Sequence, residues 1–290
     1  FRYKEDGIWH LSVPDPYRRP DGMTEAAFCD HLVAEYEALI ARVGADRIGG
    51  FFAEPIQASG GVIVPPKGYL RRMWEVCQKH DILFIADEVV TAFGRLGHWF
   101  ASEAEFGVVP DMITCAKGLT SGYLPLGALI FGDRIWEAMA ARGDRWFTSG
   151  FTYSGHPVAC AAALKNIEII ETEGLLENAA TVGDYFLDRL QGLESLPLVG
   201  QVRGRRLMVC VENVADKITK APLPDGVNES KRISDAAEAM GLMVRPIGHL
   251  NVMSPPLTIT KGQVDVVVDT LERAIRKVTD ELVREGHRIG

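Results

Sequence analysis

The hydrophobic and polar positions of this chain follow two alternating patterns. Apolar residues that recur every three or four positions, as on one face of a helix, occupy residues 24–44 and 66–77. Short continuous apolar runs, typical of strands buried on both faces of a sheet, occur at residues 48–53, 82–86, 112–116 and 126–131. Thr24 is well placed to cap the first helix, and Pro66 to open the second. The alternation predicts an α/β fold with a mainly parallel sheet that carries helices on its faces.

The second half of the chain has a different organisation. Pro157 begins an alanine-rich helix that continues through Ile170, and a second helix is predicted over residues 175–193. Weaker strand runs and two more helices follow at residues 206–211, 242–245, 230–240 and 261–285. We therefore predict a large α/β domain in residues 1–165 and a smaller α+β domain in residues 166–290.

Composition and charge exclude several classes of protein. The chain of 290 residues is 47% hydrophobic and 24% charged, which is typical of a globular protein. Its net charge of −8 argues against DNA or RNA as the principal partner. No apolar run approaches the ~20 residues needed to cross a bilayer, so we expect no membrane partner. The five cysteines are widely spaced and form no CxxC pair, which favours a cytoplasmic protein with reduced core thiols.

Motifs of other enzyme classes are missing from the sequence. No GxGxxG follows a strand-like run, which argues against a nicotinamide-dependent oxidoreductase. Neither HExxH nor GxSxG occurs, so a zinc hydrolase and an α/β-hydrolase also lack support. We predict no metal site.

Three polar residues stand where apolar runs end: Glu54, Asp87 and Lys117. In an open α/β sheet, the ligand site lies outside the carboxyl ends of the strands. A plain salt bridge between the lysine and a carboxylate is one interpretation of this pattern. Lys117, however, also precedes a glycine-bearing loop, residues 118–122, that permits close approach of a bulky group. A lysine amine in a pocket of low dielectric loses its proton readily and attacks carbonyls, so the pattern favours Schiff-base chemistry.

The same residues resemble a known family. FIADEVVTAFGR at residues 84–95, followed by PDMITCAKG at residues 110–118, is similar to the signature of class III pyridoxal-phosphate aminotransferases of fold type I. AEPIQASGG at residues 53–61 and GFTYSGHP at residues 150–157 match the same family in the same order. The resemblance covers residues 45–290. It implies a fold type I PLP-transferase-like, cofactor-binding large domain and a small C-terminal domain.

The resemblance implies roles for four residues around pyridoxal 5′-phosphate. Asp87 would keep the pyridine nitrogen protonated, which the electron-sink chemistry of this cofactor requires. Lys117 would form the Schiff base and then move a proton as general base and acid. Val89 would pack against the ring face. Thr152 would reach the phosphate of a neighbouring subunit, which implies a homodimer or higher homo-oligomer.

Substrate residues are implied in the same way. Arg245 matches the arginine that binds the carboxylate of the amino acceptor, and a planar guanidinium suits a carboxylate bidentately. Glu54 would lie near the substrate or cofactor. Val90 stands where ornithine and 4-aminobutyrate transaminases usually carry Gln, which favours the ω-amino acid/amine:pyruvate transaminase branch. His156 is interpreted as a structural residue that caps the helix beginning at Pro157.

The resemblance therefore predicts transfer of an amino group from an amine or ω-amino acid to a keto acid such as pyruvate. An aminomutase or a decarboxylase using the same Lys117 and Asp87 is an alternative, as is a non-catalytic relative. Family members carry a longer N-terminal region with a glycine-and-serine phosphate loop and an aromatic residue that stacks on the cofactor. Neither is found in residues 1–44, so the chain is expected to be part of a longer protein.

Overall fold

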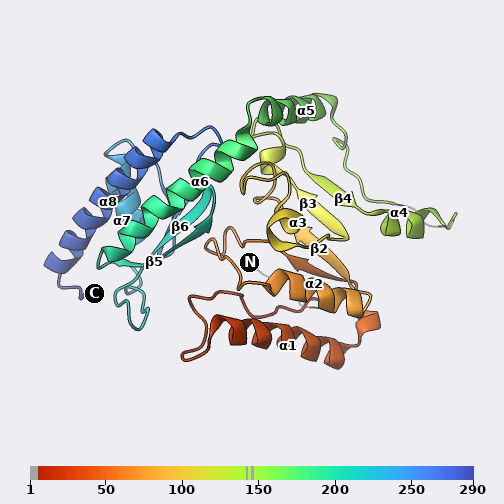
Figure 1. The fold of residues 1–290 in the computed structure, drawn as a ribbon, viewed down its shortest axis with the longest axis horizontal. Helices are drawn as coiled ribbons and strands as arrows, with labels where there is room; N and C mark the ends of the chain where they lie inside the picture. The colour runs from red at the N-terminus through yellow and green to blue at the C-terminus, as the bar shows by residue number, and fades with distance from the viewer. Residues whose placement is uncertain (1–5, 142, 145–146) are drawn as a thin grey trace.

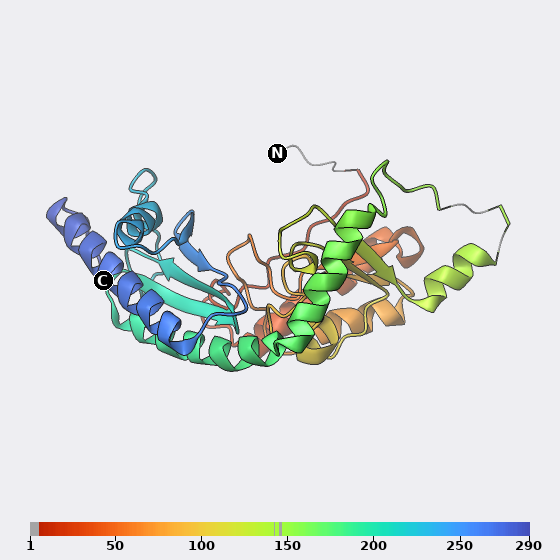
Figure 2. The same ribbon diagram turned by 90° about the horizontal axis from the view of Figure 1, so that it is seen from above.

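Two four-stranded sheets organise the chain, one in each half of the sequence (Figure 1). The computed structural model describes residues 6–141, 143–144 and 147–290. In both views the N-terminal and C-terminal halves lie side by side, and the long helix α6 (Leu175–Gln191) lies along the C-terminal half (Figure 2). None of the helices in the described part of the chain has both the length and the apolar character needed to cross a membrane.

The first sheet has the strand order β1-β2-β3-β4. Its strands are β1 (Gly50–Ala53), β2 (Leu83–Asp87), β3 (Met112–Cys115) and β4 (Ala128–Phe131). β1, β2 and β3 are parallel, and β4 is antiparallel to β3. This arrangement confirms the mainly parallel sheet that the apolar runs predict. The register pairs Ala53 with Ala86 and Asp87 with Thr114, so the ends of these strands meet at one edge.

Helices α1 (Glu25–Val43) and α2 (Tyr69–Lys79) pack together against this sheet. The Thr24 hydroxyl accepts a hydrogen bond from the Ala27 N–H at 3.1 Å, which confirms the expected cap. The ring of Phe51 lies 4.9 Å from that of Tyr36 and 5.5 Å from that of Phe84, centroid to centroid. These aromatic contacts connect α1 to β1 and β2. The short helix α3 (Ala101–Phe106) lies between β2 and β3 in the sequence.

Helix α5 (Pro157–Thr172) leads from the first half of the molecule to the second. It follows α4 (Asp133–Ala140) and an irregular stretch, and it turns into α6 at Gly174, whose φ of +62° favours glycine. The boundary expected between residues 165 and 166 lies inside α5, so the division into domains at that point stays a prediction.

The second sheet is antiparallel, with the order β5-β6-β8-β7. Its strands are β5 (Val199–Arg205), β6 (Met208–Asn213), β7 (Arg245–Ile247) and β8 (Leu250–Met253). Together with α6, α7 (Glu229–Glu238) and α8 (Lys261–Arg284), it buries one apolar core. This confirms the smaller α+β part of the predicted fold.

Sequence patterns predict only half of these strands. The strand expected at residues 206–211 is β6, the second strand of a hairpin, and it begins only at Met208. Arg206, with a φ of +52°, lies in the turn between β5 and β6. The polar residues of β5 hide its pattern. The strand expected at residues 242–245 begins only at Arg245, and Gly248 lies in the turn to β8.

Two valines of α8 test how much the C-terminal core contributes to stability. Val268 is 3% exposed and lies in that core, whereas Val266, two residues away, is 65% exposed. We expect Val268→Ala to lower the free energy of unfolding by about 1–2 kcal/mol, because it removes buried methyl groups and leaves a cavity. Val266→Ala, the matched control, makes the same helix change without the cavity. Urea denaturation of both variants checks this, and equal free energies would contradict it.

Candidate active site

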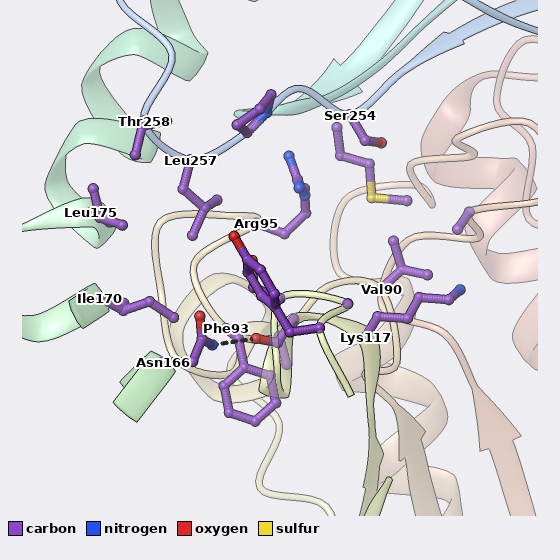
Figure 3. Close-up of a pocket in the computed structure, with 18 of the residues that line it drawn as sticks. Val90, Phe93, Arg95, Lys117, Asn166, Ile170, Leu175, Ser254, Leu257 and Thr258 are labelled. Atoms are coloured by element: carbon purple, nitrogen blue, oxygen red, sulfur yellow. Dashed lines mark hydrogen bonds between the residues drawn. The ribbon is translucent and has the colours of Figure 1, made fainter. Parts of the chain in front are cut away.

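Two cavities lie beside the first sheet, and the first of them is also lined by residues of the C-terminal half. The first, about 720 Å³, is lined by Val90, Lys117, Asn166 and Arg245, among others (Figure 3). The second, about 700 Å³, is lined by Glu54, Asp87 and parts of the N-terminal segment. The six candidate residues of the sequence are therefore divided: two lie in each cavity, and Val89 and Thr152 lie outside both described linings.

Lys117 follows the end of β3 and begins a short 3₁₀ turn, Lys117–Leu119. Its φ is +37°, a left-handed conformation that costs a non-glycine residue about 1–3 kcal/mol. The next residue, Gly118, packs so closely that a Cβ there would lie 3.0 Å from Phe93 Cβ. Within the described residues, no carboxylate pairs with the Lys117 amine. The sequence's alternative of a plain salt bridge is thus not what the described residues form.

The Asp87 and Glu54 carboxylates lie at neighbouring strand ends. Asp87 Oδ1 accepts the Val89 N–H at 3.0 Å, and Glu54 Oε2 accepts the Ala58 N–H at 2.8 Å. Burial raises the pKa of Glu54, and the negative charge of Asp87 raises it further. The Ala58 hydrogen bond and the positive charge of Lys117 lower that pKa. Because both charges act on Glu54, the three side chains form one electrostatic group although they line two cavities.

Glu88, which the sequence analysis gave no role, supports the segment after Asp87. It is fully buried, and its carboxylate accepts the N–H groups of Ala101 and Ser102 at 2.8 and 2.7 Å. The hydroxyls of Ser102 and Thr91 donate to the same carboxylate at 2.6 and 2.9 Å. Since three of its four donor groups belong to Ala101 and Ser102, which are 13 and 14 residues away, only the folded chain identifies this role. Glu88 fixes the start of α3 relative to β2.

Arg95, at the end of the motif in residues 84–95 that also contains Asp87 and Glu88, connects that segment to the second sheet. Its Nη1 donates to the carbonyl of Leu207 at 3.0 Å and to that of Pro255 at 2.6 Å. Burial lowers the pKa of Arg95 to about 10, so the guanidinium keeps its charge at neutral pH. Ser254, Leu257 and Thr258 of the segment after β8 line the same cavity as Lys117 (Figure 3), and so does Arg245. Arg95 therefore holds the segment after β8 over the cavity, a role that no local sequence pattern indicates.

Val89 and Thr152 are the candidate residues that the structure leaves outside the cavities. Val89 is half-buried, and its backbone orients Asp87 through the hydrogen bond described above. Thr152 is exposed between α4 and α5, flanked by Phe151 and Tyr153, which are 84% and 79% exposed. His156 occupies the N-cap position of α5, as expected, but its side chain makes no capping hydrogen bond.

The chemistry of these groups fits an aldehyde cofactor with a basic ring nitrogen. The Lys117 amine suits the aldehyde, and the Asp87 carboxylate suits the protonated nitrogen. The part of the chain that the structure describes holds no group of three or more His, Cys, Asp or Glu side chains suited to a metal ion.

Comparisons with known proteins identify the family of this chain. The family model of aminotransferase class-III matches residues 2–275. The putrescine–pyruvate aminotransferase of Pseudomonas aeruginosa is 42% identical over 92% of this chain and 58% of its own length. The diaminobutyrate–2-oxoglutarate transaminase of Halomonas elongata is 42% identical over 96% of this chain and 61% of its own length.

Solved structures give the same result. An (S)-enantioselective omega-transaminase from Thermomicrobium roseum superposes with a TM-score of 0.92 and 45% sequence identity. The alignment covers 96% of this chain and 62% of that one. The chain thus spans about three fifths of the length of such relatives. The family model and these identities confirm the resemblance that the motifs indicate, and the chain belongs to the class-III aminotransferases.

Proposed function

We propose that the protein is a pyridoxal-phosphate-dependent aminotransferase that moves an amino group from an amine or ω-amino acid to a keto acid such as pyruvate. The observation that carries this proposal is the Lys117 amine, which has no ionic partner among the described residues. It stands beside the Asp87 and Glu54 carboxylates and shares a cavity with Arg245. Membership of the class-III family supports the cofactor.

Each candidate residue has a task in this proposal. When bound, pyridoxal phosphate supplies an electron sink for the bond electrons of the substrate carbon. Asp87 would hold a proton at the ring nitrogen, and Val89, whose N–H orients Asp87, would pack against the ring. Lys117 would hold the cofactor through its amine and, once the substrate amine takes its place, would carry a proton to and from the substrate carbon.

Substrate selection is assigned to the first cavity. Arg245 binds the carboxylate of the keto acid, because a guanidinium matches that group with two parallel hydrogen bonds. Val90 gives the cavity an apolar wall, and Glu54, which lines the second cavity with Asp87, would lie near the substrate or cofactor. Relatives named for diaminobutyrate and putrescine support a primary amine as donor. The relative named for pyruvate, together with Val90, supports pyruvate as acceptor.

Thr152 indicates the assembly that we propose. It lies on an exposed segment that carries Phe151 and Tyr153, large side chains that lose unfavourable contact with water when covered. A second copy of the chain on this surface would bring Thr152 to the phosphate in the partner's site, so we propose a homodimer. The five cysteines form no disulfide, which supports the cytoplasmic location proposed here.

Replacing Lys117 tests the reaction. The PLP-loaded protein is expected to absorb visible light, to be trapped by borohydride at Lys117, and to form alanine from an amine and pyruvate. Lys117→Ala should abolish trapping and alanine formation, because no other residue supplies this amine. Lys117→Arg, the control, keeps the charge but forms no Schiff base, so it should be equally inactive. Turnover of the amine without any keto acid would instead favour a decarboxylase or aminomutase.

Replacing Arg245 tests acceptor binding. We expect Arg245→Leu to raise the KM for pyruvate about 10–100-fold with a much smaller change in kcat, because it removes a charge-assisted pair with the carboxylate. Arg205→Leu is the matched control, since Arg205 lies on the same sheet but pairs with Glu105 outside the cavity. Steady-state kinetics decide the matter, and equal KM values for the two variants would remove Arg245 from acceptor binding.

Glu54 predicts a pH dependence of stability. Its folded pKa lies above the ordinary value of 4.5, so the folded state binds a proton more tightly than the unfolded state does. The stabilisation from protonated Glu54 is therefore complete below pH 4.5 and is lost as the pH rises through the folded pKa. Glu54→Gln can still accept the Ala58 hydrogen bond without this loss. Its stability relative to the unmodified protein should rise over that window in urea denaturation; a pH-independent difference would contradict this.

A further inference from the structure

The side chain of Asn166 forms a double hydrogen bond with the segment that carries Lys117. Asn166 Nδ2 donates to the carbonyl of Gly118 at 2.8 Å and to that of Leu119 at 3.1 Å, and Figure 3 shows the contact across the cavity from Lys117. We propose that Asn166 is a positioning residue that holds Lys117 in the orientation in which its amine reaches the cofactor aldehyde. This inference rests on the proposed function.

The backbone at Lys117 needs an external restraint. A φ of +37° is unfavourable for lysine, and the following Gly118 restricts the backbone less than any other residue does. The two carbonyls that Asn166 binds directly follow Lys117 in the sequence. With both amide hydrogens of Asn166 engaged, the peptide groups that follow Gly118 and Leu119 are held, and the turn that carries Lys117 is restrained with them.

Helix α5 provides the rigid support from which Asn166 acts. Ala163 and Ile170, one helical turn to either side of Asn166, are buried in a cluster with Phe93, Cys115 and Leu119. The helix therefore cannot shift without disturbing packed side chains. Backbone hydrogen bonds also support this turn: the Leu119 N–H donates to the Ala116 carbonyl at 2.9 Å and the Thr120 N–H to the Lys117 carbonyl at 3.3 Å. Thr120 Oγ1 donates to the Leu124 carbonyl at 2.6 Å, beyond the two peptides that Asn166 binds.

A second asparagine offers a matched control. Asn178 on α6 donates through Nδ2 to the carbonyls of Leu257 at 2.6 Å and Ile259 at 3.1 Å. It thus joins a helix to two loop carbonyls in the same way as Asn166, but it makes no contact with the Lys117 segment. Asn178→Ala removes equivalent hydrogen bonds at a segment that lines the cavity but does not carry Lys117, and so measures the cost of such a loss away from the lysine turn.

The test uses the intact PLP-loaded enzyme and the variants Asn166→Ala and Asn166→Asp. Asp keeps the size of the side chain but donates no hydrogen bond at neutral pH, so it serves if the alanine variant folds poorly. The readouts are the pH midpoint of the visible band of the cofactor–lysine link, the rate of borohydride trapping at Lys117, and kcat against KM. The thermal midpoint is recorded for every variant.

We expect both Asn166 variants to shift the pH midpoint and to slow trapping. Their kcat should fall about 10–100-fold with a small change in amine KM, because a misplaced reacting group costs rate more than binding. Asn178→Ala should lower the thermal midpoint to a similar extent but leave the pH midpoint and the trapping rate unchanged.

Two results would overturn the inference in distinguishable ways. If the Asn166 variants lose thermal stability but keep the pH midpoint and trapping rate of the unmodified enzyme, Asn166 is structural only and the proposed function stands. If the unmodified enzyme shows no trapped Lys117, the proposed function fails and the role of Asn166 fails with it.

Discussion

The parallel pairing of β1, β2 and β3 is the constraint on which the site depends. Parallel strands end at the same edge of a sheet, and the register places Glu54 level with Asp87, with Lys117 three residues beyond the partner of Asp87. Two carboxylates and an amine from three successive strand ends, each about 30 residues after the one before, thus reach the same edge of the sheet. Burial at this edge raises the pKa of Glu54, because it disfavours the charged carboxylate. The positive charge of Lys117 lowers that pKa and so offsets part of the desolvation cost.

Contacts with backbone carbonyls join the two halves of the molecule around this edge. Arg95 reaches the carbonyls of Leu207 and Pro255 across the cavity, and Arg203 of β5 donates to the carbonyl of Gly61 at 2.8 Å. Arg203 is itself buried and paired with Glu212, so its charge is neutralised where water cannot reach it. The loop after Glu54 and the segment after β8 are therefore both held by guanidinium groups rather than by apolar packing alone.

Carbonyl contacts of this kind explain why the site residues without obvious chemistry matter. Asn166 binds the carbonyl of Gly118, directly after Lys117. Arg95 binds a carbonyl of the segment after β8, and Glu88, next to Asp87, accepts N–H groups at the start of α3. A backbone partner can be any residue type, so the partner leaves no mark in the sequence. Such residues are found only when the folded chain shows which carbonyl or N–H group each side chain faces.

The sequence by itself determined the alternation of buried strands and amphipathic helices, because the periods of strand and helix differ and can be read locally. It also singled out Lys117 and Asp87 as candidate residues, through their positions at the ends of apolar runs and the resemblance of the surrounding motifs to a family. It did not determine β5, whose pattern is interrupted by polar residues and glycine, or the short β8, which pairs with β6 from about 40 residues away in the sequence. Tertiary structure alone decided that Arg245 shares a cavity with Lys117 and that Thr152 does not. The physical reason is that long-range approach depends on packing of whole elements, which no short stretch of sequence encodes.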